Sequence, residues 1–218
     1  VQEGHQSVEK FKIQPFDSAQ DKNSKVKIDR GKLLTQEDLD KLTTPYKRYQ
    51  ITDDGISPRA LPGQKKSTHQ ANSYEHSEDG HTTEDALERT QQVDKRNRKE
   101  NTFLTRHAKL PVLYGEKDAP LTLISWGSMK APILQALKGN EKKFNYLHFS
   151  YLWPLPKDEV TKLMSDCKSI LLVENNSTAQ FGQLLRMVTG IDIQNKLLKY
   201  SGRPIYPEEV MEKVNSLW

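Results

Sequence analysis

Hydrophobic residues are concentrated in the second half of the chain. Residues 110–218 contain 49 hydrophobic residues in 109 positions, whereas residues 64–106 contain 7 in 43. A segment folds on its own only where enough apolar side chains can be buried. The pattern therefore predicts a compact domain over residues 109–218. It also predicts a long, extended polar arm over residues 31–108, which cannot fold around itself and must lie on something else.

Within the second half, short apolar runs alternate with segments of helical periodicity. The runs at 121–126, 144–149 and 169–174 predict buried strands, and residues 197–200 predict an edge strand. Helices are predicted at 129–137, at a short segment after Pro156, at 178–189, and from Pro207 to the end. The last helix is expected to turn these residues inward: Val210, Met211, Val214, Leu217 and Trp218.

Repeats of strand and helix predict parallel strands joined by right-handed crossovers, with helices on both faces. The fold class is therefore a three-layer α/β domain. Ligands of such sheets bind at the carboxyl ends of the strands. Those ends carry Gly127-Ser128, Ser150-Tyr151 and Asn175-Asn176. No GxGxxG or Walker loop is present, so simple turns are the favoured interpretation, and a nucleotide-binding module using Gly127-Ser128 is the alternative.

Composition excludes several classes of protein. A net charge of +4 and one basic run, residues 95–99 followed by Arg106, fit a solvated helix face or an acidic partner better than nucleic acid. A single cysteine, Cys167, excludes disulfide frameworks, thiolate zinc sites and iron–sulfur clusters held by this chain. It is expected in the middle of an amphipathic helix, and no acyl-transfer triad is assembled. No membrane span or signal peptide is visible, and a cytoplasmic location is expected.

The arm contains a loop with unusual chemistry at residues 49–63. Two glycines and two prolines make it stiff, and it carries Asp53, Asp54, Ser57 and Arg59. Since Pro58 restricts the backbone beside Arg59, the guanidinium loses less entropy when it binds a carboxylate. One interpretation is an anion-recognition loop. The other, favoured on residue types alone, is a linker in which Arg59 pairs locally with Asp53 or Asp54.

Three histidines, His69, His76 and His81, lie among acidic residues in the next segment. Their spacings match neither a helical ligand pair nor HExxH, so a metal site is disfavoured. A polar loop leading into a helix is favoured instead. That helix would be capped near Thr82 or Thr83, with Glu84 and Asp85 in its first turn.

Six ordered motifs over nearly the whole chain resemble one family. The motifs are YQITDDGISPRALPG, EHSEDGHTTED, LISWGSMKAPILQAL, FSYLWPLP, LLVENNSTAQFGQLLR and YSGRPIYPEE. In this order they resemble the C-terminal part of the alpha subunit of 2-oxoacid:ferredoxin oxidoreductases, with the 2-oxoglutarate branch nearest. The resemblance implies that residues 109–218 adopt a Rossmann-like sheet similar to the transketolase C-terminal domain. It also implies that residues 1–30 are the exit from a missing pyrimidine-binding domain. A chain that begins at Val1 is then expected to be a processed or truncated piece.

The family oxidatively decarboxylates a 2-oxoacid on thiamine diphosphate and Mg²⁺, passes electrons through an iron–sulfur cluster to ferredoxin, and delivers the acyl group to coenzyme A. The resemblance implies that this chain alone binds none of these cofactors. Its expected partners are the rest of the alpha subunit, the thiamine-binding beta subunit and, through the complex, ferredoxin.

The resemblance also implies that the loop approaches the active site. There, Arg59 would bind a substrate or coenzyme anion, and Asp53 or Asp54 would orient it. A non-catalytic assembly domain is the alternative. The identity of the 2-oxoacid, the stoichiometry and any role of the histidines are not readable from the sequence.

Overall fold

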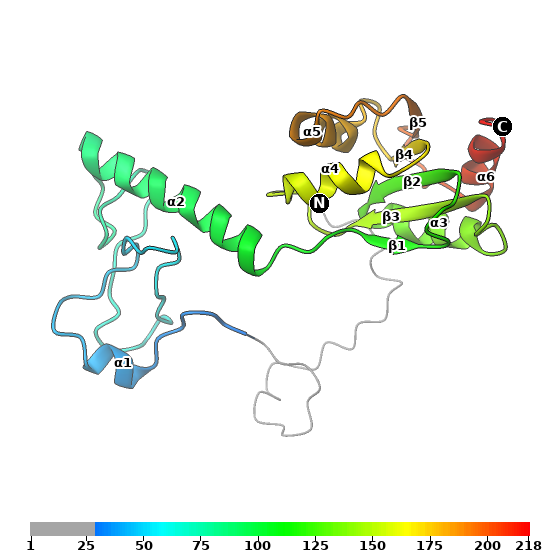
Figure 1. The fold of residues 1–218 in the computed structure, drawn as a ribbon. Coiled ribbons are helices and arrows are strands. Elements are labelled where there is room, and N and C mark those ends of the chain that lie inside the picture. Colours follow the sequence, from blue (N-terminus) through cyan, green and yellow to red (C-terminus); the bar gives the residue numbers. More distant parts are fainter. Residues whose placement is uncertain (1–28) are drawn as a thin grey trace, which may run out of the picture. The chain divides into compact units, whose positions relative to one another are not determined.

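The computed structural model describes residues 29–218. Residues 1–30, predicted to be the exit from a preceding domain, lie almost entirely outside the described residues. The chain divides into two units at His107 and Ala108. We call described residues 29–107 the loop unit and residues 108–218 the sheet unit. Figure 1 shows the elements of each.

The sheet unit contains a five-stranded sheet in the order β1-β3-β2-β4-β5. Strands β2 (Leu121–Trp126), β3 (Phe144–Phe149), β4 (Ile170–Glu174) and β5 (Asn195–Leu198) are parallel, whereas β1 (Val112–Tyr114) pairs antiparallel with β3. The predicted α/β fold with a mostly parallel sheet is confirmed by these pairings, and β2 and β3 have the predicted bounds.

Helices cover both faces of this sheet (Figure 1). Alternate strand residues point to opposite faces. On one face, Leu123 and Tyr146 pack with α3 (Lys130–Leu137) and α6 (Pro207–Asn215). On the other, Ile124 and Leu147 pack with α4 (Lys157–Ser165) and α5 (Gln180–Thr189). Burial on both faces explains why the strands read as nearly continuous apolar runs.

The bounds of α3, β4, α5 and β5 differ from the predicted ones by one or two residues. Four further details of the sheet unit differ from the sequence prediction. Strand β1 was not predicted, because it has only three residues, between Pro111 and Gly115. A short 3-10 helix, η3 (Gly127–Met129), precedes α3. Cys167 lies after the end of α4, in the turn to β4, rather than inside a helix. Trp218 is 69% exposed rather than inward, because α6 has already ended at Asn215.

The loop unit consists of one short helix, α1 (Gln36–Asp40), a long helix, α2 (Ala86–Arg106), and connecting loops. Asp85 caps α2 by accepting hydrogen bonds from the backbone N–H groups of Leu87 and Glu88. The expected polar segment leading into a helix is present, with Asp85 as the cap rather than Thr82 or Thr83.

The expectation that the arm cannot fold around itself is wrong, because the loops pack against one stripe of α2. Along this stripe, Gln92 and Lys95 donate to the carbonyl of Tyr49, and Thr102 donates to the carbonyl of Asp54. These three helix residues are buried. Polar side chains that satisfy loop carbonyls thus replace part of an apolar core, which a count of hydrophobic residues does not detect.

Candidate functional site

The loop around Asp53-Asp54-Gly55 docks on α2 through its backbone. Besides the bond from Thr102 to Asp54, the Nε of Arg98 donates to the carbonyl of Thr52 at 3.3 Å. Gly55 has φ +73°, and a Cβ at this position would lie 2.4 Å from both the carbonyl oxygen of Lys95 and the amide nitrogen of Lys99. Only glycine fits here, because the obstructing atoms are helix backbone.

Asp54 and Ser57 are held by structural contacts. Asp54 accepts a hydrogen bond from Lys32 Nζ at 2.7 Å and another from the N–H of Ile56 at 3.1 Å, and Arg106 lies 3.7 Å away. The hydrogen bond from Lys32, followed by that from Ile56, lowers the pKa of Asp54 to about 2. The hydroxyl of Ser57 donates to the carbonyl of Gln50 at 2.8 Å.

Arg59 is fixed by its backbone and exposed at its side chain. Its N–H donates to the carbonyl of Lys32, and its carbonyl accepts from the N–H of Leu34, both at 2.9 Å. Within residues 29–218, its guanidinium forms no ion pair, and neither Asp53 nor Asp54 contacts it. The local ion pair favoured from residue types is therefore wrong: Asp54 pairs with Lys32 from another segment. An orienting role for these carboxylates has no supporting contact.

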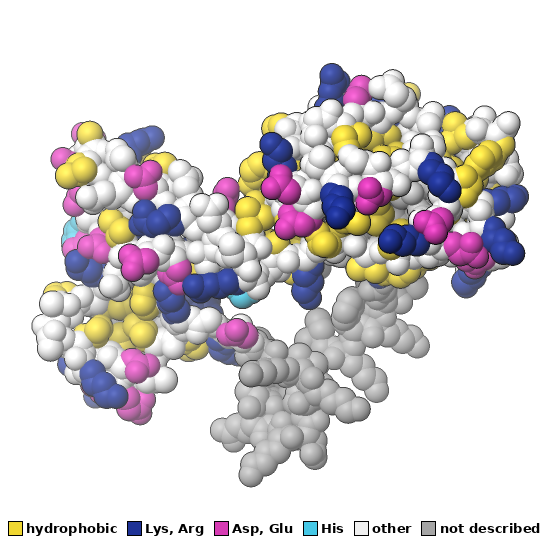
Figure 2. Space-filling model, viewed as in Figure 1, with side chains coloured by type: hydrophobic (Ala, Val, Ile, Leu, Met, Phe, Trp, Pro, Cys, Tyr) yellow, Lys and Arg dark blue, Asp and Glu magenta, His cyan; other side chains and the backbone are white. Residues whose placement is uncertain are grey.

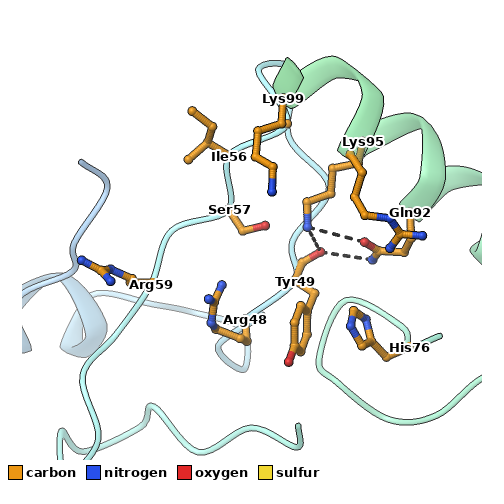
Figure 3. A pocket seen from close by; sticks show the side chains of 11 residues that line it. Arg48, Tyr49, Ile56, Ser57, Arg59, His76, Gln92, Lys95 and Lys99 are labelled. Carbon is orange, nitrogen blue, oxygen red and sulfur yellow. Dashed lines mark hydrogen bonds between the residues drawn. The ribbon is translucent and has the colours of Figure 1, made fainter. Parts of the chain in front are cut away.

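A cavity of about 400 Å³ lies between this loop and α2. Its lining includes five cationic side chains and no carboxylate: Arg48, Arg59, Lys95, Arg96 and Lys99. Arg96 is neutralised by a bidentate ion pair with Glu75, at 2.6 and 3.1 Å. In Figure 3, Lys99 and Arg48 point toward the space beside Lys95 and Ser57, whereas the guanidinium of Arg59 points away from it. Apart from Arg59 and the neutralised Arg96, the cavity gathers three cations: Arg48, Lys95 and Lys99.

Lys95 is the most perturbed of these groups. Its side chain is buried and donates to the carbonyl of Tyr49 at 2.8 Å, as Figure 3 shows. Burial, followed by the positive charges of Lys99, Arg48 and Arg96, lowers the pKa of Lys95 to about 8. An anion beside the ammonium group would oppose this shift.

The three histidines do not form a common site, because each contacts a different residue. The Nδ1 of His69 lies 2.9 Å from the carbonyl oxygen of Ser67, the ring of His76 stacks on Tyr49 at 3.6 Å between centroids, and His81 lies 3.0 Å from Asp79. Among residues 29–218, no group of three or more His, Cys, Asp or Glu side chains is arranged to hold a metal ion.

In the sheet unit, the strand-end loop after β4 is closed by its own side chains. The buried carboxylate of Glu174 accepts hydrogen bonds from the N–H groups of Phe181 and Gly182, at 3.1 and 3.0 Å, and from the side-chain amide of Asn176 at 2.6 Å. Asn176 in turn accepts from the N–H of Thr178. The start of α5, where such folds often bind phosphate, is therefore occupied by protein.

The other predicted strand-end residues have structural surroundings. Gly127 has φ +59° and begins η3, Ser128 is buried, and Asn175 follows β4 directly. Three further polar side chains, which the sequence analysis did not single out, form a buried chain: the Tyr146 hydroxyl lies 2.7 Å from both Ser125 Oγ and His148 Nδ1. These three side chains connect β2 to β3 near the carboxyl ends of the two strands.

Within residues 29–218, no helix is long and apolar enough to cross a membrane.

Comparisons with known proteins identify relatives that match most of the chain. No family model matches. The chain is 35% identical over 191 residues to the alpha subunit of 2-oxoacid:ferredoxin oxidoreductase 1 from Sulfurisphaera tokodaii. The aligned region covers 86% of this chain and 29% of that protein. It is 35% identical over 202 residues to the alpha subunit of enzyme 2 from Aeropyrum pernix, covering 89% of this chain and 30% of that protein.

A solved structure agrees with these relatives. The 2-oxoglutarate:ferredoxin oxidoreductase from Magnetococcus marinus, with 2-oxoglutarate, coenzyme A and succinyl-CoA bound, matches 80% of this chain and 31% of its own, with a TM-score of 0.68 and 28% identity. The chain is thus a homologue of 2-oxoacid:ferredoxin oxidoreductase alpha subunits, and the resemblance seen in the motifs is confirmed. It spans less than a third of the length of these relatives.

Proposed function

We propose that the chain is the alpha-subunit portion of a thiamine diphosphate-dependent 2-oxoacid:ferredoxin oxidoreductase, which converts a 2-oxoacid, with coenzyme A, to acyl-CoA and CO₂. The observation that carries this proposal is the 35% identity over 86% of the chain to a protein of that name. 2-Oxoglutarate is the proposed substrate, because a 28% identical structure holds it. The enzyme complex, its ferredoxin acceptor and a cytoplasmic location are parts of the same proposal.

We expect the cofactors of such a complex to bind outside this chain. One cysteine cannot supply the several thiolates of an iron–sulfur cluster, and burial raises the pKa of the Cys167 thiol. We therefore assign the thiamine diphosphate, Mg²⁺ and cluster sites to the rest of the alpha subunit and to the beta subunit.

This chain would contribute a scaffold, a subunit interface and an anion-binding loop. The interface is supported by the edge strand β1, where Val112 and Leu113 are 48% and 40% exposed, since exposed apolar edges favour a covering partner. Figure 2 shows hydrophobic side chains at the surface among the charged ones. The anion-binding role of Arg59 is supported by its exposed guanidinium on a fixed backbone.

The test is coenzyme A-dependent viologen reduction by the reconstituted complex with a panel of 2-oxoacids. Arg59→Ala should raise the apparent KM for one anionic substrate about tenfold, as expected for the loss of one charge-assisted hydrogen bond. Arg203→Ala, which removes an exposed arginine of the sheet unit, is the control. Unchanged kcat/KM for every 2-oxoacid and for coenzyme A would remove the Arg59 assignment but not the family membership.

A purely structural role is the second candidate, favoured by the exposed β1 edge. In that case, changes in the loop or at Val112 would alter the mass of the complex in analytical ultracentrifugation without altering the kinetics of the assembled enzyme. A free nucleotide-binding module using Gly127-Ser128 has less support, because Gly127 begins η3 and Ser128 is buried. Binding of NAD, FAD or ATP by the chain, with a Kd below about 10 μM in calorimetry, would revive it.

A further inference from the structure

The cavity of the loop unit brings together three cations that have no ionic partner among residues 29–218. Lys95 and Lys99 lie one turn apart on the same face of α2, and Arg48 comes from the loop before Tyr49. Arg48 lies over the Tyr49 ring at 5.4 Å, and Lys95 donates only to neutral oxygens, of Tyr49 and Gln92. In the described part of the chain, no salt bridge involves any of the three.

Holding these charges together is unfavourable, and the protein maintains the arrangement with rigid parts. Lys95 is 7% exposed, and its pKa is depressed partly by Lys99 and Arg48. The backbone of Gly55 lies directly against the backbone of α2 at Lys95 and Lys99, which holds this loop close to the two lysines. A bound anion would offset these positive charges without requiring the side chains to rearrange. A cluster of cations that is already in place is expected of an anion-binding site.

We propose that this cavity binds a phosphoryl group, as a phosphate ester or a diphosphate, between Arg48, Lys95 and Lys99, with the Ser57 side chain beside it. The three cations converge on one small space (Figure 3), which suits the clustered oxygens of a phosphoryl group. A linear dicarboxylate would instead need two separated cationic clusters. The volume of about 400 Å³ lies at the lower end of the range for small-molecule pockets.

The site shares the loop with the anion-binding role proposed for Arg59 but does not use that arginine, because the guanidinium of Arg59 points away from it. It also rests on the loop unit alone, so its test does not require the oxidoreductase complex. Failure of phosphate binding would leave the proposed enzymatic function unaffected, and absence of enzymatic activity would leave this site unaffected.

The experiment titrates inorganic phosphate and pyrophosphate into the 218-residue chain at low salt, followed by calorimetry and by NMR shifts of backbone amides. We expect saturable binding, with pyrophosphate tighter than phosphate, and shifts centred on residues 48–57 and 92–99. Lys99→Gln and Arg48→Gln should each weaken binding about tenfold or more, whereas Lys99→Arg should retain it. The control is Arg89→Gln, which removes an exposed charge from the same helix.

Proton linkage provides a second measurement on the unmodified chain. An anion favours the charged form of Lys95, so binding of inorganic phosphate should take up a proton and weaken as the pH rises from about 8.5 to 9.5, a range in which inorganic phosphate is almost entirely the dianion. The other charged or titratable groups around Lys95 are these: Lys99, Arg48, Arg96, Arg59, Glu78, His76 and Tyr49.

Three results would overturn the proposal. The first is the absence of saturable phosphate and pyrophosphate binding by the native chain. The second is an equal loss of affinity in Arg89→Gln and Lys99→Gln, which would indicate a general charge effect. The third is tighter binding of 2-oxoglutarate or an acidic peptide than of pyrophosphate at this cavity.

Discussion

Replacing Gly55 with alanine should separate the loop from α2. The new methyl group would lie 2.4 Å from the carbonyl oxygen of Lys95 and 2.9 Å from the Cα of Lys99, and neither backbone atom can rotate away. The positive φ costs about 1–2 kcal/mol for alanine, and the overpacking adds about 1–3 kcal/mol. We therefore expect the loop unit to lose about 2–5 kcal/mol of stability.

Gly63→Ala is the matched control. Gly63 has φ +89°, and no atom lies within 4 Å of the position that a methyl group would take there, so this variant carries the conformational cost without the clash. Hydrogen exchange of the α2 amides, measured by mass spectrometry, reports the stability of the loop unit. Tryptophan fluorescence shows whether the sheet unit is folded, because all three tryptophans lie there. If Gly55→Ala accelerates exchange no more than Gly63→Ala does, the loop does not depend on close contact with the helix backbone.

Three other predictions concern stability. Glu174→Ala should destabilise the sheet unit by about 2–4 kcal/mol, because it leaves buried N–H groups without acceptors; a loss below about 0.5 kcal/mol in urea denaturation would contradict this. Gly182→Ala should cost about 1–3 kcal/mol of stability, since its methyl group would meet the Leu172 side chain at 2.5 Å. Adding Leu172→Ala should recover part of that cost. Purely additive losses in the double-mutant cycle would argue against the contact. The pKa of Asp54 is lowered from 3.8 to about 2, so the contribution of this carboxylate to stability is present above about pH 4 and is lost as the pH falls through 2. Asp54→Asn should therefore flatten the dependence of the urea midpoint on pH between about pH 4 and pH 2. An unchanged slope would refute the linkage.

Much of the sheet unit could be predicted from the sequence, because its strands are buried on both faces. Residues 121–126 and 144–149 form strands with the predicted bounds, since their apolar runs end at turn-forming residues. Strand β1 could not be found, because three residues carry too little periodicity. The inward orientation predicted for Trp218 failed because helical periodicity was extended beyond the end of α6.

The loop unit was harder to predict because polar side chains support it. Gln92, Lys95 and Thr102 recur at helical spacing, but polar residues at that spacing usually face solvent. Lys95 and Lys99 were visible as a basic run, and their four-residue separation placed them on one face. Their convergence with Arg48 depends on the folding of a loop more than forty residues earlier in the chain, which no local pattern reveals. The domain boundaries implied by the resemblance stay a prediction.

The position of Glu174 has a consequence for how this architecture can change. Rossmann-like sheets that bind nucleotides leave the first amides of a helix free for a ligand's negative charge. Here a carboxylate from the preceding strand neutralises those amides permanently, and the absence of a side chain at Gly182 lets the helix lie close enough for this bond. A dinucleotide could bind at this edge only if the Glu174 carboxylate, which holds α5 to the sheet, were first removed. The evolution of such a site would therefore begin with a loss of stability.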